Sequence, residues 1–419
     1  MKQFTENHQI LALLKEIKKK RLDSKVYSDI TDSSGCQYVD LVQEGGGVLG
    51  IALAGYAYIL EKAGIRFFSL AGTSAGAISA MLMAATGSVG DPVSERILKI
   101  ISEKDISVFA DGHPALNRLI IRYIEGRRCF NFYLLLNAFR IWKVLRRDLG
   151  VNPGDEFERW VSLKLSDFGV DTLEDLQRLR SQLPLLFDRS QNNKAILRKA
   201  ELKIITSDIT TKTKVVFPEM AELYWKDPLT VKPARFVRAS MSVPFFFQPM
   251  VVKNIPNAGE FEEKGLPKEK SRWRKFAGYY GRIPSEVKFA DGGLLSNFPI
   301  NSFHLKHGVP KKPTFGVRLS TWRDDYSRIK SPGNMSGALI GTMRQLHDYD
   351  FLVRNPDYNK LICYIDADRD FNWLDFKLPE AGKVELFIAG AEKAFDFLDR
   401  FDWEEYKEIR KEMAGRSPW

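Results

Sequence analysis

The feature that most constrains this chain is a serine on a predicted sharp turn, in the sequence GTSAG at residues 72–76. Residues 67–71 before it and residues 77–82 after it are mostly apolar, which predicts a strand, a tight turn and then a helix. Glycines on both sides of the serine permit this bend. The predicted helix, which begins at Ala75, directs its free N–H groups and positive dipole end at whatever reacts with Ser74. The segment therefore indicates acyl transfer through a covalent serine intermediate.

A second glycine cluster lies upstream, where residues 38–44 read as a strand and residues 51–62 as a helix. The sequence between them, GGGVLG at residues 45–50, also fits the dinucleotide fingerprint G-x-G-x-x-G. A dinucleotide site needs an acidic residue at the end of the next strand, and this chain carries the Ser74 turn there. The N–H groups of successive glycines can instead converge on a developing oxyanion. We favour an oxyanion hole, with a tight turn that binds nothing as the alternative.

A serine nucleophile needs a base within hydrogen-bond reach, and histidine is the usual one. None of the five histidines follows an acidic partner at the end of a predicted strand; they are His8, His113, His304, His307 and His347. His304 and His307 have helical spacing on a segment that leads away from Asp291, so we expect structural or surface roles for them. Asp291 follows a short apolar strand and precedes Gly292 and Gly293. It is the better candidate for the base, although Asp-Gly-Gly alone often marks only a turn.

These three segments, in this order, resemble those of the patatin-like phospholipases, which use a Ser–Asp dyad without histidine. The resemblance extends to residues 202–210, 237–249 and 314–319, and to Asn297 and Pro299 after the aspartate. It covers most of the chain between residues 38 and 400, with gaps.

The resemblance implies that Ser74 is the nucleophile and Asp291 the general base. The implied oxyanion donors are the backbone N–H groups of Gly45, Gly46, Gly47 and Ala75. The other motif glycines are Gly50, Gly72, Gly76, Gly292 and Gly293. This chain departs from the family at Leu49, where the family often has Arg or Lys. We expect the lost charge to affect the handling of a substrate headgroup rather than the dyad.

The family fold is a three-layer α/β/α sandwich around a mostly parallel sheet, and the pattern of this chain agrees. Strands and helices alternate in βαβα order from residue 38 to residue 86, which predicts right-handed crossovers and a parallel sheet. Both glycine turns then lie at the carboxyl ends of strands, where such sheets bind ligands. We expect one catalytic domain over residues 36–400, with helical and loop insertions at about 110–150 and 253–286. A basic amphipathic helix and lead-in at residues 1–35 and a helical tail at residues 401–419 complete the expected organisation.

The resemblance also implies hydrolysis of a fatty acyl ester of a lipid or phospholipid, without a metal or organic cofactor. Aspartate is a weak base for a hydroxyl, so the scheme depends most on the oxyanion hole and gains from partial desolvation of Asp291. A lipid transacylase or neutral-lipid lipase would use the same residues. A non-enzymatic lipid-binding protein is the alternative from a different class. Nothing in the sequence identifies a protein activator.

Composition and cysteine usage set the outer bounds. The chain has 419 residues, 44% hydrophobic and 28% charged, as in ordinary globular proteins. Cys36, Cys129 and Cys363 form no C-x-x-C pattern, which suits a reducing compartment and argues against a disulfide framework or zinc site. The start lacks the order of a signal peptide. The longest apolar stretch, residues 130–145, is interrupted by basic residues and too short to span a membrane. We expect it to be a cap helix over an acyl channel or an ordinary core helix, in a cytoplasmic protein that binds membranes at most peripherally.

Two basic segments suggest surface contacts. Residues 9–22 form an amphipathic pattern that ends in KKKR, which suits the helix dipole or an anionic membrane. The insertion at 253–286 mixes basic and aromatic residues, which favours a phospholipid surface, with a solvated loop as the alternative. The expected contact residues are Lys270, Arg272, Trp273, Arg274 and Lys275. The net charge of +10 also suits nucleic acid, but no nucleic-acid-binding module is present, so we expect no such partner.

Overall fold

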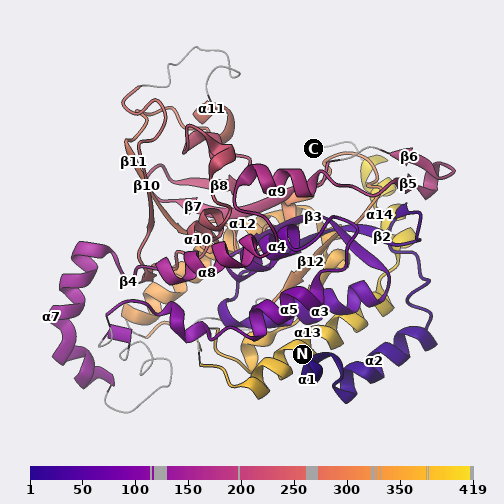
Figure 1. Ribbon diagram of the computed structural model, residues 1–419, viewed down its shortest axis with the longest axis horizontal. Coiled ribbons are helices and arrows are strands. Elements are labelled where there is room, and N and C mark those ends of the chain that lie inside the picture. The colour runs from indigo at the N-terminus through magenta and orange to yellow at the C-terminus, as the bar shows by residue number, and fades with distance from the viewer. Residues whose placement is uncertain are drawn as a thin grey trace.

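One large sheet forms the centre of the protein, as the computed structural model shows (Figure 1). The structure describes residues 1–113, 116–117, 130–196, 199–260, 272–321, 326, 328–330, 332–373, 375 and 377–415. The central strands run parallel, in the order β13-β12-β2-β3-β7. Their bounds are β2 (Gln37–Gln43), β3 (Ile65–Thr73), β7 (Leu202–Asp208), β12 (Thr314–Arg318) and β13 (Ile362–Tyr364).

Antiparallel strands add to this parallel centre. On one side β11 (Glu286–Asp291) and β8 (Thr213–Phe217) pair with β7, and β10 (Met250–Lys253) pairs with β11. Next to β2 lie β1, β5 and β6, with bounds Ile30–Asp32, Leu186–Asp188 and Lys194–Ile196. A separate parallel pair joins β4 (Gly150–Asn152) to β9 (Phe245–Phe247).

Helices cover both sides of the sheet and give the three-layer α/β/α arrangement that the sequence predicts (Figure 1). The βαβα order is confirmed, because α3 (Ile51–Lys62) joins β2 to β3 and α4 (Ala75–Ala85) follows β3. The other helices are α1 (Lys2–Thr5), α2 (His8–Lys19), α5 (Ser94–Ser102), α7 (Phe130–Asp148), α8 (Asp155–Ser166), α9 (Leu173–Arg180), α10 (Ala234–Ser240), α11 (Arg272–Ala277), α12 (Pro332–Arg354), α13 (Glu380–Arg400) and α14 (Trp403–Gly415).

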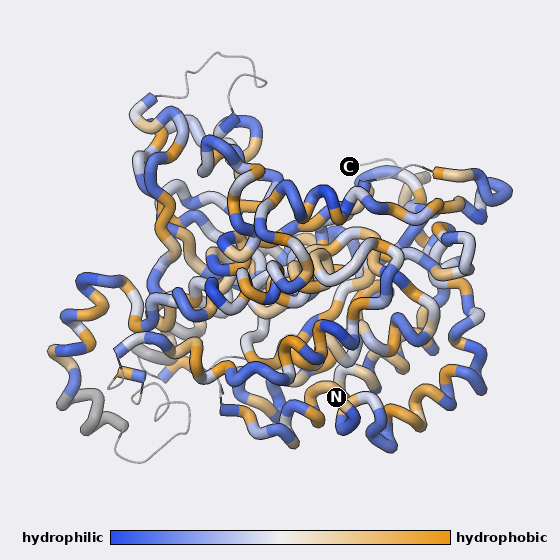
Figure 2. The backbone as a smooth tube through the Cα atoms, viewed as in Figure 1, coloured by the Kyte–Doolittle hydropathy of each residue, from blue (hydrophilic) through white to orange (hydrophobic). Residues whose placement is uncertain are grey.

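The central strands are buried along most of their length because both faces of the sheet are covered, although β2 carries the polar residues Gln37, Asp40 and Gln43. Every residue of β2 is buried, and so is nearly all of β3. Strands in such a position read as continuous hydrophobic runs rather than as alternating patterns. Figure 2 shows these hydrophobic segments in the interior, with hydrophilic residues concentrated on the outer helices and loops. The rigid parallel centre places the carboxyl ends of β2 and β3, and the turns that follow them, side by side.

The two insertions leave the body of the molecule at different places (Figure 1). Helix α7 lies at its left edge in this view, and α11 lies above the sheet. In the described part of α7, Phe139 and Trp142 are exposed, whereas Ile141, Val144 and Leu145 pack against Leu116 and Val151. The helix is therefore packed on one face only, unlike an ordinary core helix. None of its described side chains lines the pocket at Ser74, which contradicts a cap over an acyl channel for these residues; the side chains of residues 130–136 lie outside the description. Within the described ranges, no helix has the length and apolar character needed to cross a bilayer.

Candidate active site

Ser74 occupies a strained turn between β3 and α4. Its φ of 54° and ψ of −119° lie where residues other than glycine are seldom found. The turn closes so tightly that a Cβ on Gly72 would lie 2.2 Å from the Gly76 carbonyl oxygen. The Ser74 N–H donates to Ser240 Oγ at 2.9 Å, and the Ser240 hydroxyl donates to the Ile205 carbonyl at 2.6 Å. These bonds hold the serine at the N-terminus of α4, as the sequence predicts.

Asp291 lies at the end of another strand of the sheet, near the Ser74 turn. It is the last residue of β11, where it pairs with Thr206 of β7, while Thr73 pairs with the adjacent Ile205. The turn after Asp291 packs directly on the serine turn, because a Cβ on Gly292 would lie 2.9 Å from Thr73 Cγ2. Asp291 Oδ1 accepts a hydrogen bond from the Gly293 N–H at 2.7 Å. Its buried Oδ2 has no hydrogen-bond partner among the described residues.

The electrostatics of Asp291 suit a base. Burial raises the pKa of this carboxyl, and the positive charge of Arg344, the nearby Ser74 hydroxyl and the Gly293 N–H each oppose the rise. The Ser74 hydroxyl points to Met241 Sδ, 3.2 Å from Ser74 Oγ, and thioether sulfur is a weak acceptor. The Ser74 hydroxyl, the predicted nucleophile, is therefore held near the carboxyl without a strong competing partner among the described residues.

The glycine loop after β2 lies against the serine. A Cβ on Gly45 would lie 3.0 Å from Ser74 Cβ. The N–H of Gly45 donates to the Asn297 carbonyl at 3.1 Å, so it is not a free oxyanion donor, in contrast to the sequence-based expectation. The N–H groups of Gly46, Gly47 and Ala75 have no acceptor among the residues that the structure describes. Gly47 has a φ of 55°, which favours glycine and turns the loop over Ser74.

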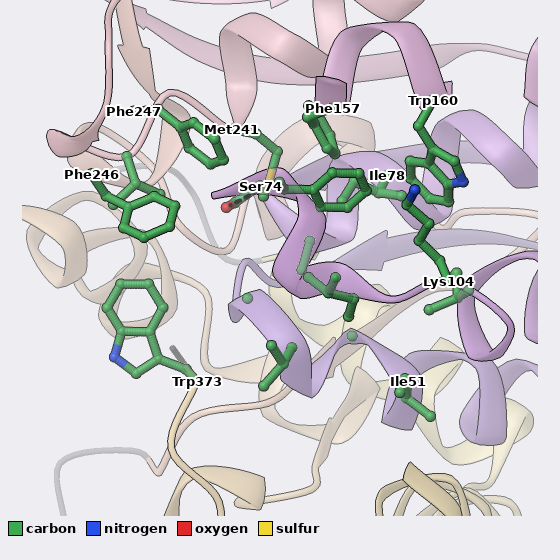
Figure 3. Close-up of a pocket in the computed structure, with 18 residues that line it drawn as sticks. Ile51, Ser74, Ile78, Lys104, Phe157, Trp160, Met241, Phe246, Phe247 and Trp373 are labelled. Atoms are coloured by element: carbon green, nitrogen blue, oxygen red, sulfur yellow. Dashed lines mark hydrogen bonds between the residues drawn. The ribbon is translucent and has the colours of Figure 1, made fainter. Parts of the chain in front are cut away.

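An apolar pocket of about 770 Å³, including its mouth, opens at Ser74 (Figure 3). Gly47, Ser74 and Ala75 line it together, so the predicted nucleophile and two candidate oxyanion donors face the same space. Its other lining residues are almost all apolar, with Phe246 and Phe247 on one side of Ser74 and Trp160 on the other. Among the described residues that line it, Lys104 is the charged one. The pocket can hold a hydrocarbon chain with its carbonyl end at Ser74.

A polar cavity of about 720 Å³ lies next to the glycine loop and shares Trp373 with the apolar pocket. Gly46 and Leu49 line it, and so do Arg344 and Asn297. Leu49 itself is buried and apolar. The cations that line this cavity are Arg318, which pairs with the buried Glu44 at 3.1 Å, and Arg344, which comes from α12. Sequence reasoning did not identify Arg344, because no local pattern connects a residue inside α12 with the glycine loop.

Asn297 joins the loops on which the two predicted catalytic residues depend. Its Nδ2 donates to the Gly45 carbonyl at 3.1 Å and to Glu44 Oε1 at 3.2 Å. Glu44 is buried and accepts further hydrogen bonds from the N–H groups of Leu319 and Ser320 at 2.7 and 2.9 Å. The sequence marked Asn297 only as part of a motif, and its bracing role is visible only in three dimensions.

Four of the histidines lie away from this site. His8, His113, His304 and His307 are not among the residues that line the apolar pocket or the polar cavity. The side chain of His347 lies outside those that the structure describes. His304 Nδ1 lies 3.0 Å from the Tyr358 hydroxyl, and its ring packs edge-on against Phe351. In the part of the chain that the structure describes, no group of three or more His, Cys, Asp or Glu side chains could hold a metal ion.

The expected membrane contacts around residue 273 are placed differently from what the sequence suggested. Trp273 is only 3% exposed, because its ring packs edge-on against Tyr224 with centroids 5.4 Å apart. A membrane-contact role for Trp273 is therefore wrong. Arg272 pairs with Glu222 at 3.1 Å, and Arg274 lies over the Tyr280 ring. Lys270 lies outside the described residues.

Comparisons with known proteins identify a family and two similar proteins. The family model described as patatin-like phospholipase matches residues 41–304. The chain is 29% identical over 368 residues to the uncharacterized protein YqhO of Bacillus subtilis (strain 168), covering 87% of this chain and 100% of YqhO. Among solved structures it is similar to VipD from Legionella pneumophila, with 16% identity and a TM-score of 0.41, covering 90% of this chain and 70% of that chain.

Proposed function

Because this chain belongs to the patatin-like phospholipase family, we propose that it hydrolyses fatty acyl esters of phospholipids with Ser74 as nucleophile and Asp291 as general base. Lipid acyl hydrolysis in general is the activity of the family. The observation that carries the finer proposal is the position of the Asp291 carboxyl. Its Oδ2 is buried and has no other hydrogen-bond partner among the described residues, and it lies near Ser74, a strained serine that faces an apolar pocket.

In the first half of the reaction, the Ser74 hydroxyl attacks the ester carbonyl and its proton passes to Asp291. The carbonyl oxygen becomes an oxyanion, and the N–H groups of Gly47 and Ala75, with that of Gly46 from the polar side, are the donors available to it. Collapse of this intermediate breaks the bond to the alcohol, which leaves with the proton that Asp291 had taken. The acyl chain remains on Ser74 with its hydrocarbon in the apolar pocket.

In the second half, water attacks the acyl-enzyme and gives its proton to Asp291. The same N–H groups stabilise the second oxyanion. Breakdown releases the fatty acid and returns the proton to Ser74, so the enzyme is unchanged. Burial supports the role of Asp291 because it raises the pKa of the carboxyl and makes it a better base than an exposed aspartate.

Product analysis tests this proposal. Purified protein is incubated with vesicles of defined phospholipids, and products are identified by mass spectrometry; free fatty acid and lysophospholipid are expected. A product in which the acyl chain has moved to another lipid would indicate a transacylase instead, and activity confined to triacylglycerol would indicate a neutral-lipid lipase. Labelling by a fluorophosphonate probe that depends on Ser74 separates all three from a lipid-binding protein without activity, which would not be labelled.

A further inference from the structure

We propose that helix α7 is a docking surface for anionic lipid bilayers, formed by Phe139, Trp142 and the basic side chains around them. This inference rests on the proposed function to the extent that the bilayer would supply the substrate. The segment around Trp273, which the sequence favoured for this role, buries its tryptophan. Helix α7 presents the combination of exposed aromatic and basic residues that was expected there.

Two aromatic residues of α7, among the side chains of this helix that the structure describes, face away from the protein. Phe139 is 74% exposed and Trp142 is 55% exposed, and their ring centroids lie 6.3 Å apart. The opposite side of the helix is anchored, because Ile141, Val144 and Leu145 pack against Leu116 and Val151. The exposed pair is thus additional to the residues that fix the helix. Aromatic residues in this position are typical of side chains that insert at the headgroup level of a bilayer.

The charges of α7 define the kind of surface that fits it. Between residues 137 and 148 the basic side chains are Arg140, Lys143, Arg146 and Arg147, and the acidic one is Asp148. Asp148 is occupied by Arg147 at 2.8 Å. The Arg146 guanidinium lies 5.0 Å from the centre of the Trp142 ring, so cation and aromatic occupy the same face. An anionic bilayer complements both features of this surface.

Helix α7 is also connected to the wall of the apolar pocket. It leads directly into β4, whose Gly150 pairs with Phe245 and whose Asn152 pairs with Phe247. Asn152 Nδ2 donates to the Phe246 carbonyl at 3.0 Å. Phe246 and Phe247 line the pocket, whereas Phe245, on the same strand, is 64% exposed. Figure 1 shows β4 between α7 and the rest of the molecule. A bilayer bound at α7 would therefore lie on the side of the molecule where β4 and β9 connect this helix to the wall of the pocket.

The test measures binding of a catalytically silent protein, so that its outcome does not depend on activity. In a Ser74→Ala background, one variant carries R140Q, K143Q and R146Q, and a second carries F139S and W142S. The matched control carries R272Q, R274Q and K275Q, which remove as many charges from α11. Sedimentation is measured with vesicles of phosphatidylcholine alone and of phosphatidylcholine and phosphatidylglycerol in equal parts, at low and high salt.

We expect the α7 charge variant to bind anionic vesicles about 10²-fold more weakly at low salt, since three charges are lost, and the α11 control to bind as the parent does. The aromatic variant should lose binding at both salt concentrations. Unchanged thermal unfolding midpoints and, with Ser74 restored, unchanged hydrolysis of a short soluble ester exclude misfolding. Equal binding by the parent and both α7 variants, or a loss confined to the α11 control, would overturn the proposal. So would a dimer of the parent that the α7 variants convert to a monomer, because α7 would then be a protein interface.

Discussion

Arg344 Nη2 donates a hydrogen bond to Asn297 Oδ1 at 2.9 Å, which links helix α12 to the brace between the two active-site loops. Asn297 is bonded to Gly45 in both directions, through its side chain and through its carbonyl. Burial raises the pKa of the Asp291 carboxyl, and the charge of the same arginine opposes this rise. One side chain from outside the motifs therefore acts on the geometry of the glycine loop and on the basicity of the proposed catalytic carboxyl.

Replacement of Arg344 tests the electrostatic part of this relationship. Without the cation, the pKa of Asp291 rises, so a larger fraction of the carboxyl is protonated and inactive as a base at a given pH. We expect Arg344→Met to move the acidic limb of the kcat/KM profile to higher pH, and Arg344→Lys, which keeps the charge, to move it less. The profile is measured with a soluble ester. A uniform loss of rate at all pH values would instead assign Arg344 a structural role only.

Removal of the proposed nucleophile tests the chemistry itself. Ser74→Ala should lower kcat by about 10³-fold or more, since no other hydroxyl at the pocket occupies the strained turn. Because alanine is no larger than serine and the turn is held by backbone contacts, the circular dichroism spectrum should not change. Turnover close to that of the unmodified protein would remove the basis of the proposed mechanism.

The carboxyl of Asp291 is expected to support activity while it lowers stability. Asp291→Asn should lower kcat by about 10²–10⁴-fold, the usual contribution of a general base. It should also raise the thermal unfolding midpoint at neutral pH, because the raised pKa means that the charged form is disfavoured in the folded state. His304→Ala serves as the comparison and should retain activity. If both variants lost activity equally, a histidine would have to be added to the mechanism.

The glycine loop allows a graded test of the oxyanion donors. Gly47→Ala should lower kcat by about 10²–10³-fold, because its Cβ would lie 2.2 Å from the Trp373 carbonyl oxygen at a φ that disfavours alanine. Gly46→Ala should cost less, since its Cβ meets the flexible end of Leu319. The control is Gly341→Ala on α12, where a Cβ meets no described atom within 4 Å. If the Gly47 variant were as active as the control, the loop would be a turn that supplies no oxyanion donors.

Local sequence patterns predicted those parts of the fold that depend on the conformation of a short stretch of backbone. The strand–turn–helix around Ser74 follows from the glycines and flanking apolar runs, and β3 and α4 begin and end within two residues of the expected bounds. The occupied N–H of Gly45 could not be foreseen, because its acceptor is the distant Asn297. The burial of Trp273 was missed for a similar reason. A tryptophan among basic residues indicates a membrane contact from sequence alone, because its packing partner, Tyr224, is far away in the sequence.

Asp348, one helical turn after Arg344, gives a prediction about stability against pH. Its Oδ2 accepts from the Phe298 N–H at 2.9 Å and its Oδ1 from the Ser296 hydroxyl at 3.2 Å. Asp348 therefore holds residues 296–298, the segment that Arg344 contacts through Asn297. Burial raises the pKa of Asp348 to about 7; Arg318 and Lys214 oppose the rise, and Glu44 adds to it.

The folded state thus binds this proton more tightly than the unfolded chain, in which aspartate titrates near its ordinary value. The contribution of Asp348 to the free energy of unfolding is therefore fully present below about pH 4 and is lost as the pH rises to about 7. Asp348→Asn removes this dependence and keeps both contacts, since its amide oxygen can accept from Phe298 and its NH₂ can donate to the Ser296 hydroxyl. The difference in unfolding free energy, variant minus parent, should grow between pH 4 and pH 7 by at most roughly 4 kcal/mol and stay constant above pH 8. Urea unfolding at a series of pH values measures it, and a difference that does not change with pH would show that Asp348 is charged in the folded protein throughout this range.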